Sequence, residues 1–189
     1  MGIPYAVETV LSEYITLFNK HFPGELGGLY IHGSIALNAY VDDSSDIDFI
    51  TVTDRRLIEK DLETLSIIHT KIANKFKMPE MDGVYITLGD IGKLHNNNKD
   101  FKSKYPYFNE GILTFGDYFN FNPITWWVFQ KSGINRVGPT TTTFNIDIQS
   151  NQLHSYVLNN MNSYWANRIQ TMENSKAEIN NLPTNIVNS

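Results

Sequence analysis

Apolar residues recur at two different spacings along the chain, and each spacing predicts one kind of element. Spacings of three and four residues predict helices at about Val7–Phe18, Arg56–Phe76 and Gln152–Met172. Short continuous or alternating apolar runs predict strands at Leu29–Ile31, Ser44–Val52 and Pro79–Thr87. His69 lies on the second of these helices, where we expect it at the surface or boundary. Residues 94–122 show no clear periodicity, so we assign no role there.

A pair of small residues, Gly33 and Ser34, follows the first predicted strand, and residues 35–37 (Ile-Ala-Leu) are typical of the opening of a helix. Small residues at a strand-to-helix corner let backbone N–H groups approach phosphate oxygens, and a helix N-terminus adds partial positive charge. Ser34 also offers a hydroxyl donor. The corner is therefore a candidate phosphate-binding turn.

Two carboxylates, Asp46 and Asp48, lie on the second predicted strand. Side chains alternate along a strand, so these two project to the same side. Carboxylates held side by side repel each other unless a cation lies between them, and Mg²⁺ takes hard oxygen ligands while leaving positions for substrate phosphates. The chain has no cysteine and only five scattered histidines, so zinc has no obvious site. A small-residue turn followed by paired carboxylates indicates metal-assisted nucleotidyl transfer.

Residues 30–34 (Tyr-Ile-His-Gly-Ser) and 45–50 (Ser-Asp-Ile-Asp-Phe-Ile) together resemble the signature of the nucleotidyltransferase superfamily related to DNA polymerase beta. Within it, the chain is most similar to the aminoglycoside adenylyltransferases that modify streptomycin and spectinomycin, over about residues 26–165. The resemblance implies an α+β fold, with a mixed β-sheet flanked by helices and a small or truncated C-terminal helical region. It also implies that Gly33 and Ser34 bind the nucleotide, and that Asp46 and Asp48 are catalytic and hold two Mg²⁺ ions.

The family also has a third carboxylate, on a later strand, which completes the metal site or serves as the general base. Asp82 matches that position because it precedes the apolar residues of the third predicted strand, so we expect it to be a metal ligand and a catalytic residue. Glu80 is the alternative, since it shares the face of Asp82 by parity but lies beside Pro79, nearer the loop. Family members of the streptomycin type usually carry a glutamate here, and an aspartate has a shorter reach.

The composition restricts the partners. The formal net charge of -5 disfavours broad nucleic-acid binding, which needs clustered Lys and Arg, and it favours a cationic acceptor. No apolar run approaches the ~18 residues of a membrane-spanning helix, and no signal-peptide pattern opens the chain. We therefore expect a cytoplasmic protein that does not enter the membrane.

A second similarity lies downstream, where residues 123–129 and 133–139 resemble the helix and Gly-Pro turn that open the family's C-terminal helical domain. We therefore expect a nucleotidyltransferase domain at 1–121 and a partial helical region at 122–189. The resembled enzymes continue into a fuller bundle that walls the acceptor cleft. Either another chain completes that cleft, for instance in a homo-oligomer, or the protein is a short relative or a fragment.

The resemblance implies an enzyme that uses Mg²⁺ and transfers AMP from ATP to a hydroxyl of a small cationic acceptor, with an aminoglycoside antibiotic as the first choice. One alternative is a protein-modifying adenylyltransferase of the toxin–antitoxin type, which is disfavoured because no arginine occurs at residues 35–38. The other alternative is a non-catalytic nucleotide-binding module.

Overall fold

A computed structural model describes residues 3–94 and 104–180 of the 189-residue chain. The chain divides into two compact units, Met1–Asp147 and Ile148–Ser189. The division lies later than the domain boundary expected at residues 121 and 122, so three elements beyond that boundary belong to the first unit: a helix, a strand and a 3₁₀ turn. That residues 122–189 form a partial helical domain stays a prediction.

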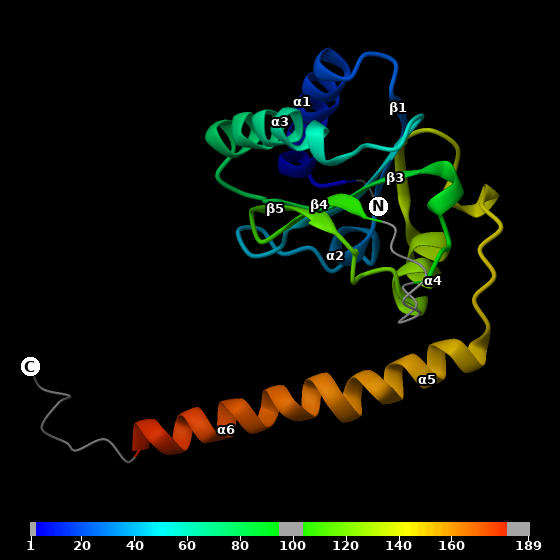
Figure 1. Cartoon of the computed structure of the whole chain (residues 1–189). Helices are drawn as coiled ribbons and strands as arrows, with labels where there is room; N and C mark the ends of the chain where they lie inside the picture. The colour runs from blue at the N-terminus through cyan, green and yellow to red at the C-terminus, as the bar shows by residue number, and fades with distance from the viewer. Residues whose placement is uncertain (1–2, 95–103, 181–189) are drawn as a thin grey trace, which may run out of the picture. The chain divides into compact units, whose positions relative to one another are not determined.

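The first unit is built on a mixed six-stranded sheet, which confirms the predicted fold class (Figure 1). Its strands are β1 (Leu26–Ile31), β2 (Ile47–Thr53), β3 (Met81–Thr87), β4 (Tyr105–Asn109), β5 (Ile112–Gly116) and β6 (Ile134–Val137). They lie in the order β5-β4-β3-β2-β1-β6, and the β2–β3 pair is parallel whereas the other pairs are antiparallel. The three strands predicted from the sequence are therefore the three central ones.

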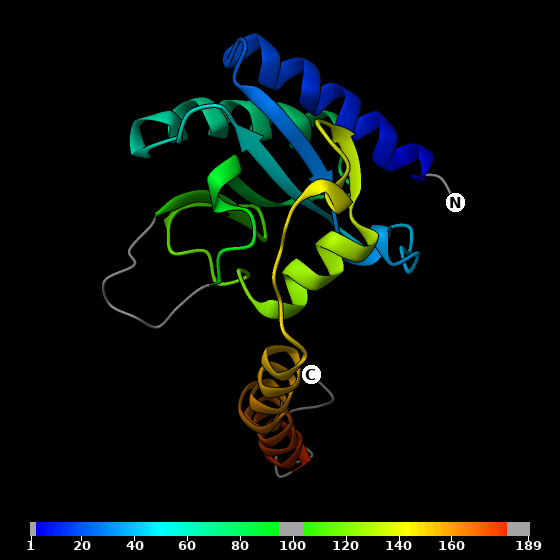
Figure 2. The same cartoon turned by 90° about the vertical axis from the view of Figure 1, so that its right-hand side faces the viewer.

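Helices cover both faces of this sheet, with α1 and α3 together on one side and α4 on the other (Figure 2). The helices of this unit are α1 (Tyr5–His21), the four-residue α2 (Gly33–Ala36), α3 (Leu62–Lys75) and α4 (Pro123–Ser132). Short 3₁₀ turns lie at Glu59–Asp61, Leu88–Asp90 and Thr141–Thr143. The two long helices predicted in this part of the chain are confirmed as α1 and α3, although α3 starts later than Arg56 because Glu59–Asp61 is a 3₁₀ turn.

The main core lies between the sheet and the α1–α3 layer. Alternation along β2 and β3 sends Phe49 and Tyr85 into this core, where they pack with Tyr14 and Phe18 of α1. The same alternation places Asp48 and Asp82 on the opposite face. The amphipathic pattern of the sequence thus decides which face of the sheet carries the charged residues.

The second unit contains one helical run, composed of α5 (Ser150–Asn160), a π-helical turn (Met161–Trp165) and α6 (Ala166–Asn180). It includes the helix predicted at residues 152–172. Among the residues that the structure describes, no helix combines the length and apolarity needed to cross a membrane.

Candidate functional site

The Gly33-Ser34 corner is fixed by its contact with β2. Gly33 has a φ of +61°, and a Cβ atom on it would lie 1.7 Å from the Asp48 carboxylate oxygen Oδ2. The backbone N–H of His32 donates to the carbonyl of Asp48 over 3.0 Å. Only glycine fits both the positive φ and this close approach. The corner therefore holds its backbone directly against one of the two predicted metal ligands.

The helix that follows the corner is shorter than expected. α2 ends at Ala36, so it is a single turn and its macrodipole is smaller than that of a full helix. The contribution of the corner to phosphate binding rests instead on its backbone N–H groups and on the Ser34 hydroxyl. The backbone N–H of Ser34 lies close enough to Asp48 to lower the pKa of that carboxyl, against the larger effect of burial.

The three predicted carboxylates lie at one edge of the sheet, where the parallel strands β2 and β3 begin. Asp48 and Asp82 are direct neighbours in the register of these strands, and Asp46 immediately precedes β2. Parallel strands start at the same edge, so residues near the beginning of both strands are brought together. The structure thus unites residues that are more than thirty positions apart in the sequence, as the resemblance implied.

The pKa values of Asp46 and Asp48 at this edge are raised by burial and by repulsion from neighbouring carboxylates. Burial raises the pKa of Asp48 to about 7, and the charges of Asp46 and Asp82 add to the shift. Burial also raises the pKa of Asp46, with a further contribution from the charge of Asp82. No Lys, Arg or His side chain forms an ion pair with these three acids within residues 3–94 and 104–180. A cation or a hydrogen-bond donor at this edge would relieve the repulsion.

Two polar atoms at this site are buried and have no hydrogen-bond partner in the described part of the chain: the Ser34 hydroxyl oxygen and Asp82 Oδ1. Buried polar groups in folded proteins are normally paired, so a pair of unsatisfied atoms beside crowded carboxylates is informative. The other oxygen of Asp82 accepts a 3.0 Å hydrogen bond from the backbone N–H of Glu110, in the β4–β5 hairpin turn. Asp82 is therefore oriented by one oxygen while the other remains available.

Tyr118 and Tyr107 also belong to this face of the sheet, and the sequence reasoning missed both. Tyr107 pairs with Val84 of β3, one strand from the aspartates, and its ring lies 5.3 Å from that of Tyr118. Burial raises the pKa of Tyr118 to about 12, and the nearby charges of Asp48 and Asp82 contribute. Both residues lie in the segment without clear periodicity, where the alternation of the short β4–β5 hairpin was the available signal.

Glu80, the alternative third carboxylate, lies differently from Asp82. It is exposed and precedes β3, and it lines a cavity on the α3 side of the sheet together with Met81 and Phe108. Its charge does not contribute to the pKa shifts of Asp46 and Asp48, whereas that of Asp82 does. This geometry favours Asp82 for the role shared with Asp46 and Asp48.

The donor set fits a hard divalent cation. Within residues 3–94 and 104–180, no group of three or more Asp, Glu, His or Cys side chains is arranged to hold a metal ion by itself. Mg²⁺ is usually bound through one or two carboxylates together with substrate phosphates rather than by a complete protein cage. The unpaired oxygen of Asp82 and the raised pKa values of its neighbours suit such a shared site.

No protein-family model matches the chain, and no curated protein matches it. Among solved structures, it is similar to the spectinomycin adenyltransferase AAD(9) from Enterococcus faecialis, determined with ATP and spectinomycin, with a TM-score of 0.59 and 15% identity. The match covers 82% of this chain and 66% of AAD(9), so the chain spans about two thirds of the length of that enzyme. A putative nucleotidyltransferase from Sulfolobus solfataricus matches 48% of this chain and 79% of its own length, at 25% identity and a TM-score of 0.29. The chain has a nucleotidyltransferase-type fold, as the sequence resemblance implied.

Proposed function

We propose that the chain is a nucleotidyltransferase that moves AMP from ATP to a hydroxyl group of a small cationic acceptor and releases pyrophosphate. The observation that carries this proposal lies at the start of β2 and β3, where three carboxylates crowd together without a cationic partner among the described residues. Beside them is a glycine corner whose Ser34 hydroxyl is buried and has no partner in the same part of the chain. A triphosphate with its cation supplies both missing interactions. The nucleotidyltransferase-type fold supports the same reaction class.

The residues of the Gly33-Ser34 corner would bind the phosphates, and the aspartates at the start of β2 and β3 would bind the metal ion. The backbone and hydroxyl of Ser34, with Gly33 allowing close approach, would bind phosphate oxygens. Asp46 and Asp48, with Asp82, would hold Mg²⁺. When bound, Mg²⁺ would neutralise the negative charge of the triphosphate and would also stabilise the negative charge that develops on the phosphoryl oxygens during transfer.

Asp82 would accept the proton of the acceptor hydroxyl or orient that hydroxyl. Its oxygen Oδ1 has no partner within the described residues, while Oδ2 is held by the Glu110 N–H. A base that is fixed through one oxygen presents the other in a constant direction, which favours proton transfer.

The acidic edge also supports a cationic acceptor. AAD(9) was determined with spectinomycin, and an aminocyclitol or aminoglycoside carries both hydroxyl groups and positive charge. Carboxylates of this edge that are not occupied by Mg²⁺ would attract such a molecule. We therefore place spectinomycin and streptomycin first among the acceptors to be tried.

Pyrophosphate release from ATP, measured with Mg²⁺ and a panel of acceptors, tests the proposal. Asp46→Asn and Asp48→Asn should abolish release, because each removes a charged oxygen without changing side-chain volume. Asp42→Asn provides the control, since Asp42 is an exposed aspartate in the segment before β2. Circular dichroism of all variants would confirm that the fold is retained.

Turnover that survives in both variants would contradict the assignment of Asp46 and Asp48. Binding of ATP and Mg²⁺ by calorimetry, without release for any small acceptor, would favour the non-catalytic module. AMP transfer to a protein but not to the panel would favour the protein-modifying alternative.

A further inference from the structure

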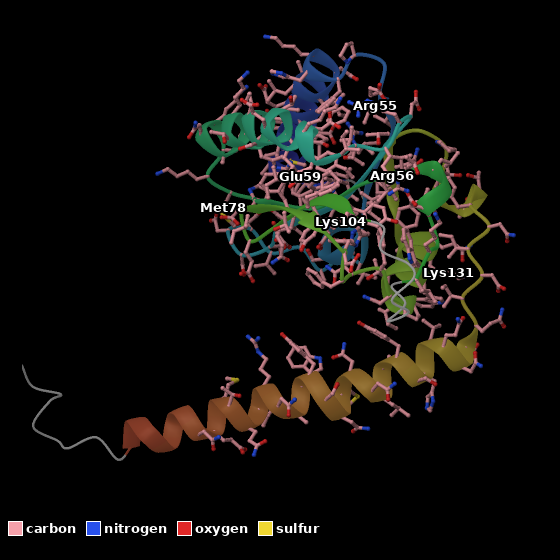
Figure 3. The ribbon with its side chains drawn as sticks, viewed as in Figure 1. Arg55, Arg56, Glu59, Met78, Lys104 and Lys131 are labelled. Carbon is pink, nitrogen blue, oxygen red and sulfur yellow. The ribbon has the colours of Figure 1, made fainter. Side chains whose placement is uncertain are left out.

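A cavity of about 260 Å³ lies on the face of the sheet opposite the aspartates, between α3, the start of β3 and the β4–β5 hairpin. Figure 3 labels Met78 in the α3–β3 connection, immediately before the cavity residue Pro79. Most of the wall is apolar, and it is formed by Ile72, Ala73, Phe76, Met81, Phe108 and Leu113. Apolar walls that carry a few polar groups are typical of small-molecule sites.

His69 supplies the polar group of this wall. It is only 7% exposed, contrary to the expectation of a surface or boundary position, and its ring stacks on Phe108 with centroids 3.5 Å apart. Its Nε2 atom lies 2.7 Å from the hydroxyl of Tyr85, whereas its Nδ1 atom has no hydrogen-bond partner in residues 3–94 and 104–180. Nδ1 is not among the buried side-chain atoms that lack a partner, so it is accessible where His69 lines the cavity. It therefore offers a hydrogen-bonding position to a ligand in the cavity.

The surroundings of His69 allow that ligand to donate or to accept. The hydroxyl of Tyr85 lies close enough to that of Tyr14 for the two groups to affect each other's pKa, and the Tyr14 hydroxyl lies 2.7 Å from the Thr51 hydroxyl. Each hydroxyl in this chain both donates and accepts, so the chain can reverse its direction and select either tautomer of His69. Burial also lowers the pKa of His69 to about 3, which keeps the ring neutral.

The rim of the cavity does not favour a charged ligand. Lys77 and Glu80, which carry opposite charges, both line it, together with the neutral residues Ser66 and Thr70. A charged group moved into the apolar interior would lose its hydration without a matching partner. A neutral molecule with one hydrogen-bonding group is compatible with both the apolar wall and the rim, whose charges are of opposite sign.

We infer that this cavity is a second binding site, which takes a compact neutral molecule with an apolar ring and a hydroxyl group that bonds to His69. The site is separate from the nucleotide edge, since Met81 and Phe108 face α3 whereas Asp82 faces away from it. The cavity also lies next to the residues that hold Asp82 in place. Met81 precedes Asp82, and the cavity residue Gly111 follows Glu110, whose N–H orients Asp82.

Phenol and toluene test the inference as a matched pair, because they have nearly the same shape and differ in the hydroxyl group. In ¹H–¹⁵N NMR titrations of the full chain, phenol should produce saturable shifts of the amides of Thr70, Ala73 and Gly111. Ala73→Phe, on the exposed rim, should abolish these shifts by filling the cavity. Ala6→Phe, at an exposed alanine of α1, is the matched control and should leave them unchanged.

His69→Phe keeps an aromatic ring against Phe108 but removes the nitrogen. It should weaken phenol binding about two- to tenfold, the usual range for one hydrogen bond, and leave toluene within about twofold. Shifts that do not saturate, or that persist in Ala73→Phe, would overturn the site. Equal weakening of phenol and toluene in His69→Phe would overturn the role of His69. None of these measurements depends on nucleotide turnover.

Discussion

The two ends of the parallel β2–β3 pair carry the same kind of residue in opposite electrostatic states. At the starting end, Asp46, Asp48 and Asp82 crowd together without a protein cation among the described residues, and the pKa values of Asp46 and Asp48 are raised. At the other end, Asp61 and Asp90 each have an arginine partner. The chain thus keeps one group of carboxylates neutralised and leaves the other group to be neutralised by something else.

The neutralised end is built from Arg55 and Arg56, which follow β2 and are labelled in Figure 3. Arg55 donates two hydrogen bonds to Asp61, and Arg56 donates two of 2.7 Å to Asp90. The side chain of Asp90 is 0% exposed, and hydrogen bonds from Thr87, Lys93 and Arg56 hold its pKa well below the usual range despite its burial. These residues stabilise the ends of the strands.

The comparison separates carboxylates that form structural ion pairs from carboxylates that a ligand would stabilise. Perturbed pKa values occur both in structural ion pairs and in functional sites, and the direction of the shift distinguishes them here. Acids with lowered pKa values already have their partners. Acids with raised pKa values, next to unpaired polar atoms, are those that a ligand would stabilise.

The largest expected effect lies at the starting end. If Asp82 is the general base, Asp82→Asn should leave ATP binding intact and lower turnover by about 10²–10⁴-fold, because a general base typically contributes that much and an amide cannot accept the proton. The amide oxygen can still accept the Glu110 N–H, so the fold should persist. Single-turnover kinetics with ATP and Mg²⁺ would measure the loss. Glu80→Gln is the control, and a loss in that variant in place of Asp82→Asn would transfer the role to Glu80.

At the neutralised end, Asp90→Asn should destabilise the protein by roughly 3 kcal/mol, because it leaves Arg56 without its carboxylate partner. Urea unfolding at pH 7 would measure the difference, and Asp42→Asn, at an exposed acid, should change stability by less than about 0.5 kcal/mol. Since the folded pKa of Asp90 lies below its unfolded value, its contribution is present above pH ~4 and is lost as the pH falls. An equal effect of both substitutions would remove the contrast between the two ends.

The smallest effect is a gain in stability at the starting end. The folded pKa of Asp48 is about 7, above its unfolded value, so wild-type protein loses stability as the pH rises from about 4 to about 7. Asp48→Asn removes this loss and should be more stable than wild type at pH 8, with little difference at pH 4. The full shift would be worth about 4 kcal/mol, but solvent at this partly exposed site and coupling to Asp46 and Asp82 reduce the expected gain to on the order of 1 kcal/mol. Thermal unfolding across this pH range would test the sign. A variant that is less stable than wild type at pH 8 would show that Asp48 is not an uncompensated charge.

Several elements followed directly from local patterns. The helical spacing near the N-terminus predicted α1. The parity of Asp46 and Asp48 predicted that they share one side of a strand, but Asp46 lies just before β2, where its charge still raises the pKa of Asp48. The glycine at position 33 was explained only by tertiary packing, since the atom that excludes a side chain there belongs to Asp48. β6 was missed because its four residues resemble a turn, and its pairing with β1 is what makes it a strand.

The sequence by itself indicated the proposed type of chemistry, because the order of a small-residue turn and two alternating acids is a local property of neighbouring residues. It also determined, through strand alternation, that Asp48 lies on the face opposite Phe49. Only the tertiary structure decided that Asp82, more than thirty residues away, stands beside Asp48, and that Tyr118 borders both. Only it decided that Glu80 lies on the cavity side and that His69 is buried. Pairing between strands and burial depend on contacts between distant segments, and these contacts also set the pKa values that distinguish the two ends of the sheet.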